Sequence, residues 1–125
     1  MGTDYAVPAA REREMLAFYR ERLAKEMPGR SMIYGHIGDA HLHVNMLPAT
    51  EVEAKKSAAL VKEFAAHAVE LGGTVSAEHG LGRRKAGLLR LQYSEDEIEM
   101  MRAVKRRLDP EWLLGRGTLF GEGAL

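Results

Sequence analysis

Four of the five histidines of the 125-residue chain fall into two short polar clusters. Histidine is the side chain best suited to bind a metal or to move a proton near neutral pH. The first cluster contains His36, His41 and His43, and the second is the pair Glu78-His79. Imidazole and carboxylate groups together are a common ligand set for zinc and similar divalent ions. The two clusters are therefore the first candidates for a functional site.

The first cluster has the alternating pattern of a strand with one polar and one apolar face. Side chains of a strand point alternately to the two faces of its sheet, so His41, His43 and Asn45 share one face. The residues between them are apolar and suit a core: Leu42, Val44 and Met46. If His36 ends the preceding strand, a reversal of the chain brings it back near His43. Spacing alone leaves a structural role for these histidines as open as a ligand role.

Two other features have weaker interpretations. His67 lies in the middle of a predicted helix, and we expect it to be a surface or core-edge residue with no role. The basic, glycine-rich stretch 80–85 either holds an anion through free N–H groups or forms an ordinary solvated turn.

Two long amphipathic helices are predicted before the second cluster. The first covers residues 9–27, stops at Pro28-Gly29, and places one apolar stripe on a core: Met15, Leu16, Tyr19, Leu23 and Met27. The second begins at a capping box formed by Thr50 and Glu53 and ends before Gly72-Gly73. Its expected buried residues are Val52, Leu60, Val61, Phe64, Ala68 and Leu71.

Four short strands are predicted around these helices, at Asp4–Val7, Ser31–Ile37, Leu42–Leu47 and Thr74–Ala77. The order β-α-β-β-α-β is that of the ferredoxin-like split βαβ arrangement, an α+β fold with an antiparallel sheet and helices on one face. A C-terminal helical appendage follows, with a short helix at 83–91 and another that starts at a second capping box, Ser94 with Glu97. Its expected apolar stripe is Ile98, Met101, Val104 and Leu108. We expect residues 1–125 to form a single domain.

Composition excludes several function classes. The 18 basic and 18 acidic residues balance, so no long-range attraction to nucleic acid is expected. The chain has no cysteine, which excludes disulfides, thiolate metal sites and cysteine nucleophiles. No apolar run approaches the roughly 20 residues that span a bilayer, and no signal peptide is recognisable. We therefore expect a cytoplasmic protein with no membrane insertion.

Two long motifs and a short one resemble the C-terminal domain of FAD-linked oxidases. They are the stretches 36–45, 73–82 and Leu108-Asp109-Pro110, which occur in that order. The subgroup they resemble contains D-lactate dehydrogenase, the glycolate oxidase FAD subunit and D-2-hydroxyglutarate dehydrogenase. The resemblance covers nearly the whole chain.

The resemblance implies a role for individual residues. His36, His43 and Glu78 correspond to the ligands of a divalent metal such as Zn, Mn or Fe. His79 corresponds to the base that removes the hydroxyl proton of a small 2-hydroxy acid while hydride passes to the flavin. Asn45 corresponds to a residue that contacts the substrate. A metal that binds a hydroxyl lowers its pKa, so an adjacent histidine can take the proton.

The chain departs from this family in three respects. Family members usually have Gly at the position of Ala40, followed by Asn or His, and they often end in Asn-Pro-Gly-Lys where this chain has Gly115–Thr118. By this resemblance, the flavin-binding domain, which would make most of the contacts with FAD, is missing. The first half of the substrate cap, which carries a carboxylate-binding arginine in the family, is missing too. We therefore expect a fragment, a truncated gene product or one subunit of a split enzyme, inactive alone and able to form a homodimer. The alternative is a stand-alone ferredoxin-like module that binds a metal or small acid without catalysis.

Overall fold

The computed structural model describes residues 1–121, and these fall into two compact units that divide after Gly80. The first unit contains β1 (Tyr5–Ala6), α1 (Glu12–Glu26), β2 (Ser31–His36), β3 (His41–Met46) and α2 (Glu51–Glu70). The second contains α3 (Leu89–Gln92) and α4 (Glu95–Leu108). Short 3-10 turns precede α1, link β2 to β3 and precede α3: Ala9–Arg11, Ile37–Asp39 and Ala86–Leu88. That residues 1–125 form one domain stays a prediction.

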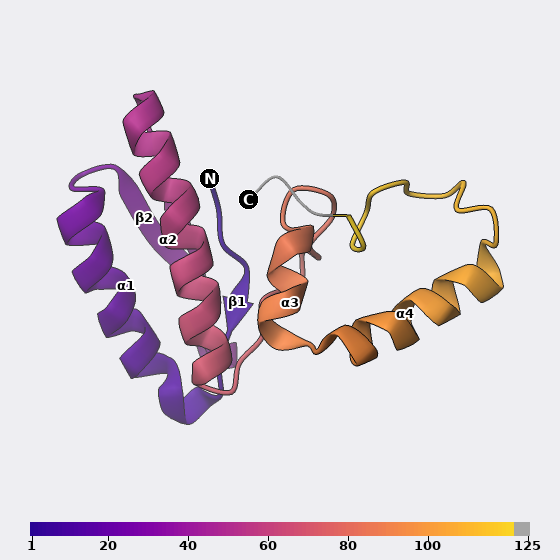
Figure 1. Ribbon diagram of the computed structural model, residues 1–125. Coiled ribbons are helices and arrows are strands. Elements are labelled where there is room, and N and C mark those ends of the chain that lie inside the picture. The colour runs from indigo at the N-terminus through magenta and orange to yellow at the C-terminus, as the bar shows by residue number, and fades with distance from the viewer. Residues whose placement is uncertain (122–125) are drawn as a thin grey trace. The chain divides into compact units, whose positions relative to one another are not determined.

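The sheet of the first unit has three antiparallel strands in the order β1-β3-β2, so β3 lies in the centre (Figure 1). The predicted pairing of the second and third strands is confirmed, with Tyr34 opposite His43 and His36 opposite His41. The mixed α+β class is also confirmed. The strand predicted at Thr74–Ala77 is reduced to a single bridge between Thr74 and Ala6, and the ferredoxin-like assignment therefore stays a prediction.

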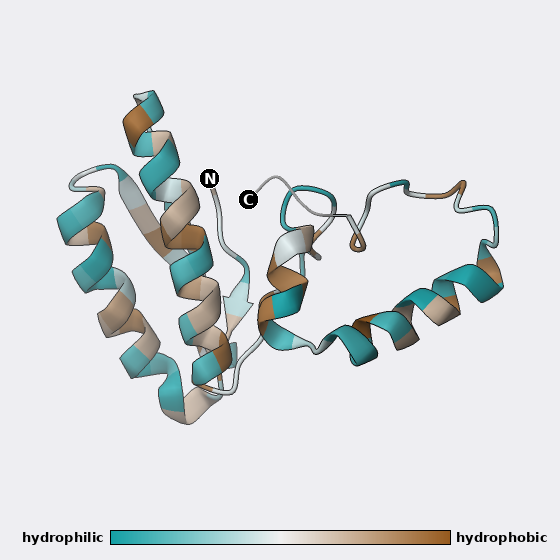
Figure 2. Ribbon diagram, in the orientation of Figure 1, coloured by the Kyte–Doolittle hydropathy of each residue, from teal (hydrophilic) through white to brown (hydrophobic). Residues whose placement is uncertain are grey.

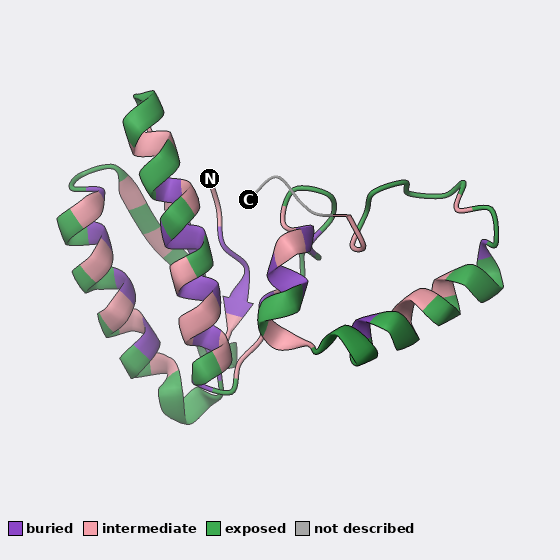
Figure 3. Ribbon diagram, viewed as in Figure 1, coloured by how far each residue is buried: buried purple, intermediate pink, exposed green. Residues whose placement is uncertain are grey.

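Helices α1 and α2 lie side by side over one face of this sheet (Figure 1). Their apolar residues alternate with polar ones along each helix (Figure 2), and the buried ones recur once per turn on α2 (Figure 3). The predicted stripe of α1 is buried at Met15, Tyr19 and Leu23. The apolar residues of β3 complete the core from the sheet side: Leu42, Val44 and Met46.

Two predicted apolar stripes are wrong in part. Val52 is 66% exposed because it lies in the first turn of α2, which extends past α1 and β2 (Figure 1). On α4, Ile98 is buried as predicted, whereas Val104 and Leu108 are exposed. A unit as short as the second one has too little chain to cover a whole helix.

Both predicted helix starts are capped by side chains. Ser94 and Glu97 form the complete capping box, with each side chain bonded to the backbone N–H of the other residue. At α2, the Thr50 hydroxyl accepts the N–H of Glu53, while the Glu53 carboxylate accepts the N–H of Ala49 instead. The helix predicted at 83–91 begins later than expected, after a turn, as α3. No helix among residues 1–121 is both long and apolar enough to cross a membrane.

Phe64 is expected to be the most costly truncation in the core of the first unit. Its ring is fully buried, with the rings of Tyr19 and Phe18 packed edge-on at centroid distances of 4.8 and 5.9 Å. Phe64→Ala should lower the free energy of unfolding by about 3–5 kcal/mol, because burial is lost and a cavity forms. Urea unfolding followed by circular dichroism measures this, with the exposed Val52→Ala as the control. A loss below about 1 kcal/mol for Phe64→Ala would contradict the packing described here.

Candidate functional site

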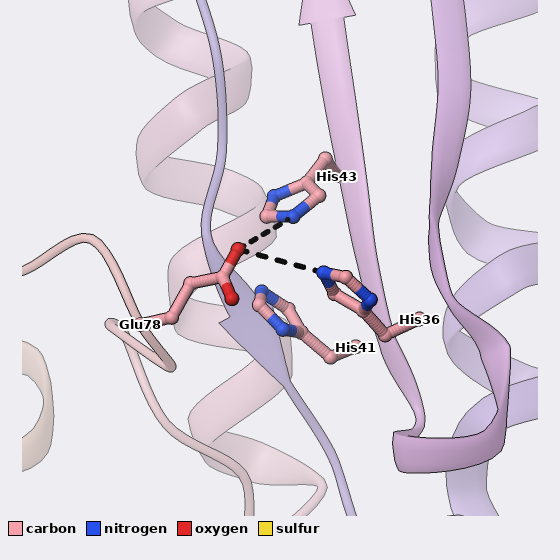
Figure 4. Close-up of side chains that lie close together, drawn as sticks. All are labelled: His36, His41, His43 and Glu78. Atoms are coloured by element: carbon pink, nitrogen blue, oxygen red, sulfur yellow. Dashed lines mark ion pairs between the residues drawn. The ribbon is translucent and has the colours of Figure 1, made fainter.

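The two polar clusters of the sequence meet at one place in the first unit. His36 ends β2, His41 and His43 lie on β3, and Glu78 comes from the segment that follows α2 (Figure 4). Oε1 of Glu78 is 3.1 Å from Nε2 of His43 and 3.6 Å from Nε2 of His36. One potential ligand atom from each of the four side chains lies within 4.8 Å of the others. The structure thus brings together the three residues that the family resemblance implies as metal ligands, with His41 of the same polar cluster beside them.

The hairpin sets the spacing of the histidines. Gly35 pairs with Leu42 across the two strands, and a Cβ on Gly35 would lie only 2.6 Å from the backbone oxygen of His41, so a side chain does not fit there. The turn closes at Ala40, whose φ of 49° lies in the left-handed region that favours glycine. This conformation explains why a glycine suits that position in the family described above. His43 is only 6% exposed at its side chain, whereas His36 is 55% exposed, so the site opens on the His36 side.

Glu78 is positioned through β1. The chain leaves α2 at Gly73, where a Cβ would lie 2.2 Å from the carbonyl oxygen of Ala6. Only glycine permits so close an approach of two backbones. Thr74 then donates its N–H to Ala6 at 2.9 Å, and the chain continues past β1 towards the histidines. Because β1 pairs with β3, this path delivers Glu78 to the face that carries His43.

The backbone of Thr3 determines which nitrogen of His43 is free. Nδ1 of His43 lies 3.2 Å from the carbonyl oxygen of Thr3, and the Thr3 hydroxyl accepts the N–H of Val44 at 2.9 Å. A carbonyl oxygen only accepts hydrogen bonds, so Nδ1 carries the proton in the neutral ring. The lone pair is then on Nε2, the atom that faces Glu78. Such a partner on the far ring nitrogen is the usual support of a metal-binding histidine.

His79 stands beside these groups. Its ring stacks on that of His43, with centroids 5.0 Å apart and planes inclined by 4°. Nε2 of His79 is 3.2 Å from Oε1 of Glu78, and Nδ1 is 3.8 Å from Oδ1 of Asp4. A second group of potential ligands consists of Asp4, His43, Glu78 and His79. His36 belongs only to the first group and His79 only to the second, so the two groups share His43 and Glu78.

Asp4 is the residue of the site that sequence reasoning missed. The sequence pattern places Asp4 only at the start of the predicted strand Asp4–Val7, although an acidic residue in an apolar strand is itself unusual. Its side chain is 1% exposed and lies 3.0 Å from Nε2 of His41. Burial by itself raises the pKa of this carboxyl, but the hydrogen bonds from the His79 N–H, the Ser76 hydroxyl and the Glu78 N–H outweigh burial and hold the pKa below its usual value. The group is therefore an ionised acceptor.

The remaining sequence candidates are placed as follows. Asn45 lies on the same strand face as His43 and donates its side-chain N–H to the hydroxyl of Tyr34 at 2.9 Å. His67 lies on α2, where it contacts the ring of Phe18 and the carboxylate of Glu70, and its lack of a role stays a prediction. Within the basic, glycine-rich stretch 80–85, residues 82–85 form a turn that leads towards the four-residue helix α3. The stretch therefore does not open a long helix, whose first free N–H groups would hold an anion.

Residues 1–119 match a family defined as FAD linked oxidases, C-terminal domain. An uncharacterized FAD-linked oxidoreductase of Mycobacterium tuberculosis is 35% identical over 119 residues, which is 95% of this chain and 25% of the relative. A D-2-hydroxyglutarate dehydrogenase of Xanthomonas citri pv. viticola is 43% identical over 91 residues, 70% of this chain and 19% of the relative. A glycolate oxidase subunit of Bacillus subtilis is 35% identical over 95 residues, 73% of this chain and 20% of the relative. The chain thus spans a quarter or less of the length of these relatives.

Proposed function

Because the chain belongs to the family of FAD linked oxidases, through their C-terminal domain, we propose that it is the substrate- and metal-binding portion of an FAD-dependent 2-hydroxy-acid dehydrogenase or oxidase. Two of its relatives are named for enzymes of 2-hydroxy acids, D-2-hydroxyglutarate and glycolate. Which 2-hydroxy acid it uses would depend on residues that read the rest of the substrate, beyond the hydroxyl and carboxylate that all these acids share.

The observation that carries this proposal is the convergence of His36, His43 and Glu78 on one point. Two imidazoles and one carboxylate fit Zn, Mn or Fe(II), and they leave coordination positions for a substrate. His43 presents the lone pair of Nε2 because its Nδ1–H is held by the carbonyl of Thr3. His36 is the most exposed of the three, which leaves access from that side. A divalent ion bound there would lower the pKa of a substrate hydroxyl.

His79 is placed to take the hydroxyl proton. With Glu78 engaged by the metal, its carboxylate, 3.2 Å from Nε2 of His79, would no longer hold a proton on that nitrogen. The ionised carboxylate of Asp4, 3.8 Å from Nδ1 of His79, would then favour the tautomer with the proton on Nδ1. Nε2 then has a free lone pair beside Glu78 and can accept the proton. A bound flavin would supply the acceptor for the hydride that leaves the hydroxyl-bearing carbon of the substrate. Asn45, on the same face as His43, would contact the substrate through its amide.

The flavin in this proposal belongs to a flavin-binding domain or subunit outside this chain. The matched parts of the relatives cover only 19 to 25% of their length. Residues 1–125 would thus bind the acid and the metal but would not turn over substrate alone.

A chimera tests this proposal. The matching part of the chain, 70% of its residues, replaces the corresponding 91-residue segment of the Xanthomonas D-2-hydroxyglutarate dehydrogenase, to which it is 43% identical. Bound FAD, seen as flavin absorbance, reports that the chimera has folded. The expected result is reduction of an electron-accepting dye with glycolate, D-lactate or D-2-hydroxyglutarate, and loss of this activity after chelation of the metal.

The alternative, a metal- or acid-binding module without catalysis, gives a different outcome. A chimera that holds FAD and metal but reduces no dye with any of the three acids would overturn the catalytic proposal. Zn²⁺ titration of the 125-residue chain by calorimetry tests the metal part separately. A chain that binds no Zn²⁺, Mn²⁺ or Fe²⁺ would overturn that part.

A further inference from the structure

The carboxylate of Asp4 collects hydrogen bonds from the segment that carries Glu78 and His79. Its Oδ2 accepts the hydroxyl of Ser76 at 2.9 Å and the N–H of Ala77 at 3.1 Å. The same oxygen accepts the N–H of Glu78 at 3.2 Å and that of His79 at 2.8 Å. Three consecutive backbone N–H groups thus converge on one buried oxygen. Backbone turned in this way forms an anion-binding nest, and here an anion of the same chain fills it.

The other oxygen of Asp4 faces the strand that carries the histidines. Oδ1 lies 3.0 Å from Nε2 of His41, and since the carboxylate only accepts hydrogen bonds, Nε2 of His41 carries the proton. The neighbouring residue, Thr3, holds Nδ1 of His43 through its carbonyl. Two consecutive residues before β1 therefore contact both His41 and His43 and, through Asp4, the segment with Glu78. Among the described residues, no other buried carboxylate is hydrogen-bonded to both polar clusters.

We propose that Asp4 is the positioning residue that holds Glu78 and His79 against His43, and this inference rests on the proposed function of that site. Apart from the single bridge at Thr74, the segment 76–79 pairs with the chain before β1 through one backbone hydrogen bond, from the N–H of Ala77 to the carbonyl oxygen of Asp4 at 3.0 Å. The conformation at Glu78 and His79 therefore depends on what their N–H groups bind. Asp4 replaces the missing strand: it turns the backbone so that Oε1 of Glu78 meets Nε2 of His43 and the ring of His79 stacks on that of His43.

Asp4 acts through Glu78 and is not itself a ligand. It belongs to the second group of potential metal ligands, but both of its oxygens are engaged by donors of the protein. An amide in its place would keep the shape of the side chain but leave one oxygen for donors that two oxygens now serve. The new NH2 group would also face N–H donors. Asp4→Asn should therefore release the segment 76–79 without removing any residue of the metal site.

The test compares Asp4→Asn with Asp109→Asn in the full 125-residue chain. Asp109 is a matched control, because its buried carboxylate also accepts two backbone N–H groups, those of Leu113 and Leu114, but it belongs to the second unit. Zn²⁺ affinity by calorimetry should fall about 10- to 100-fold in Asp4→Asn, which is the usual cost of losing a hydrogen-bonding residue that orients the metal ligands. It should stay unchanged in Asp109→Asn. Amide hydrogen exchange at Glu78 and His79 in the metal-free chain should become at least about tenfold faster in Asp4→Asn alone.

Each outcome bears on the inference. Unchanged affinity together with unchanged exchange in Asp4→Asn would overturn it. If the parent chain binds no Zn²⁺, the proposed metal site fails, and the exchange rates alone decide the role of Asp4. If Asp4→Asn does not fold, Ser76→Ala takes its place, because it removes one hydrogen bond to the same oxygen. A smaller loss of affinity in the same direction supports the inference, and no change in affinity or exchange contradicts it.

Discussion

Replacing His43 by alanine is expected to weaken Zn²⁺ binding to the chain by more than about 100-fold, because it removes one of three converging ligands. His43 is the most buried of these three side chains, and its Nε2 already lies 3.1 Å from Oε1 of Glu78. The carbonyl of Thr3 fixes its ring, so the site loses the ligand that is best organised before metal binds. Isothermal titration of the full chain measures the effect.

The matched control for this change is His67→Ala. His67 is also a partly covered histidine beside an aromatic ring and a carboxylate, those of Phe18 and Glu70, but it lies on α2 away from the site. Its replacement should leave Zn²⁺ affinity as in the parent. Equal affinity in His43→Ala and the parent would show that the metal ligands are assigned wrongly.

Replacing His79 by glutamine is expected to abolish most of the turnover of the FAD-containing chimera while it spares the metal. A positioned general base contributes about 10²- to 10⁴-fold to a proton transfer, so kcat should fall by that factor. His79 stacks on His43 but is not one of the three proposed ligands, so the ligand set stays complete without it. Steady-state dye reduction gives kcat, and Zn²⁺ titration of the isolated variant chain gives the affinity.

Two results would contradict this role. A large loss of Zn²⁺ affinity in His79→Gln would identify His79 as a metal ligand. Full turnover in the variant would show that another group takes the proton. His67→Gln in the same chimera provides the control for a histidine-to-glutamine change that leaves the site intact.

Local patterns were sufficient to predict most of the fold of the first unit. Alternation of apolar residues around His43 predicts strand β3, and the stripe that includes Tyr19 predicts α1. The capping boxes at Thr50 and Ser94 predict the starts of α2 and α4. These signals lie within a few residues of the feature they predict, since a strand or a helix start depends on neighbours in the chain.

The predictions were wrong where a residue depends on distant partners. Val104 and Leu108 continue an apolar stripe, yet a stripe shows only which face would be buried if a partner covered it. The stretch 74–77 has the composition of a strand, but after Gly73 the chain pairs with β1 at a single bridge only. Beyond that bridge, the side chain of Asp4 accepts the backbone N–H of Ala77.

By itself, the sequence determined which groups are available for chemistry: three histidines around one hairpin, and a Glu-His pair beyond α2. Only the tertiary structure decided that these groups meet, and through which residues. Asp4 precedes Glu78 by 74 positions along the chain, and no local pattern reports a contact over such a separation. The contact exists because β1 pairs with the strand of His43 and also receives the chain that leaves α2. A buried carboxylate at that junction must find donors, and it finds them in the backbone N–H groups of Glu78 and His79.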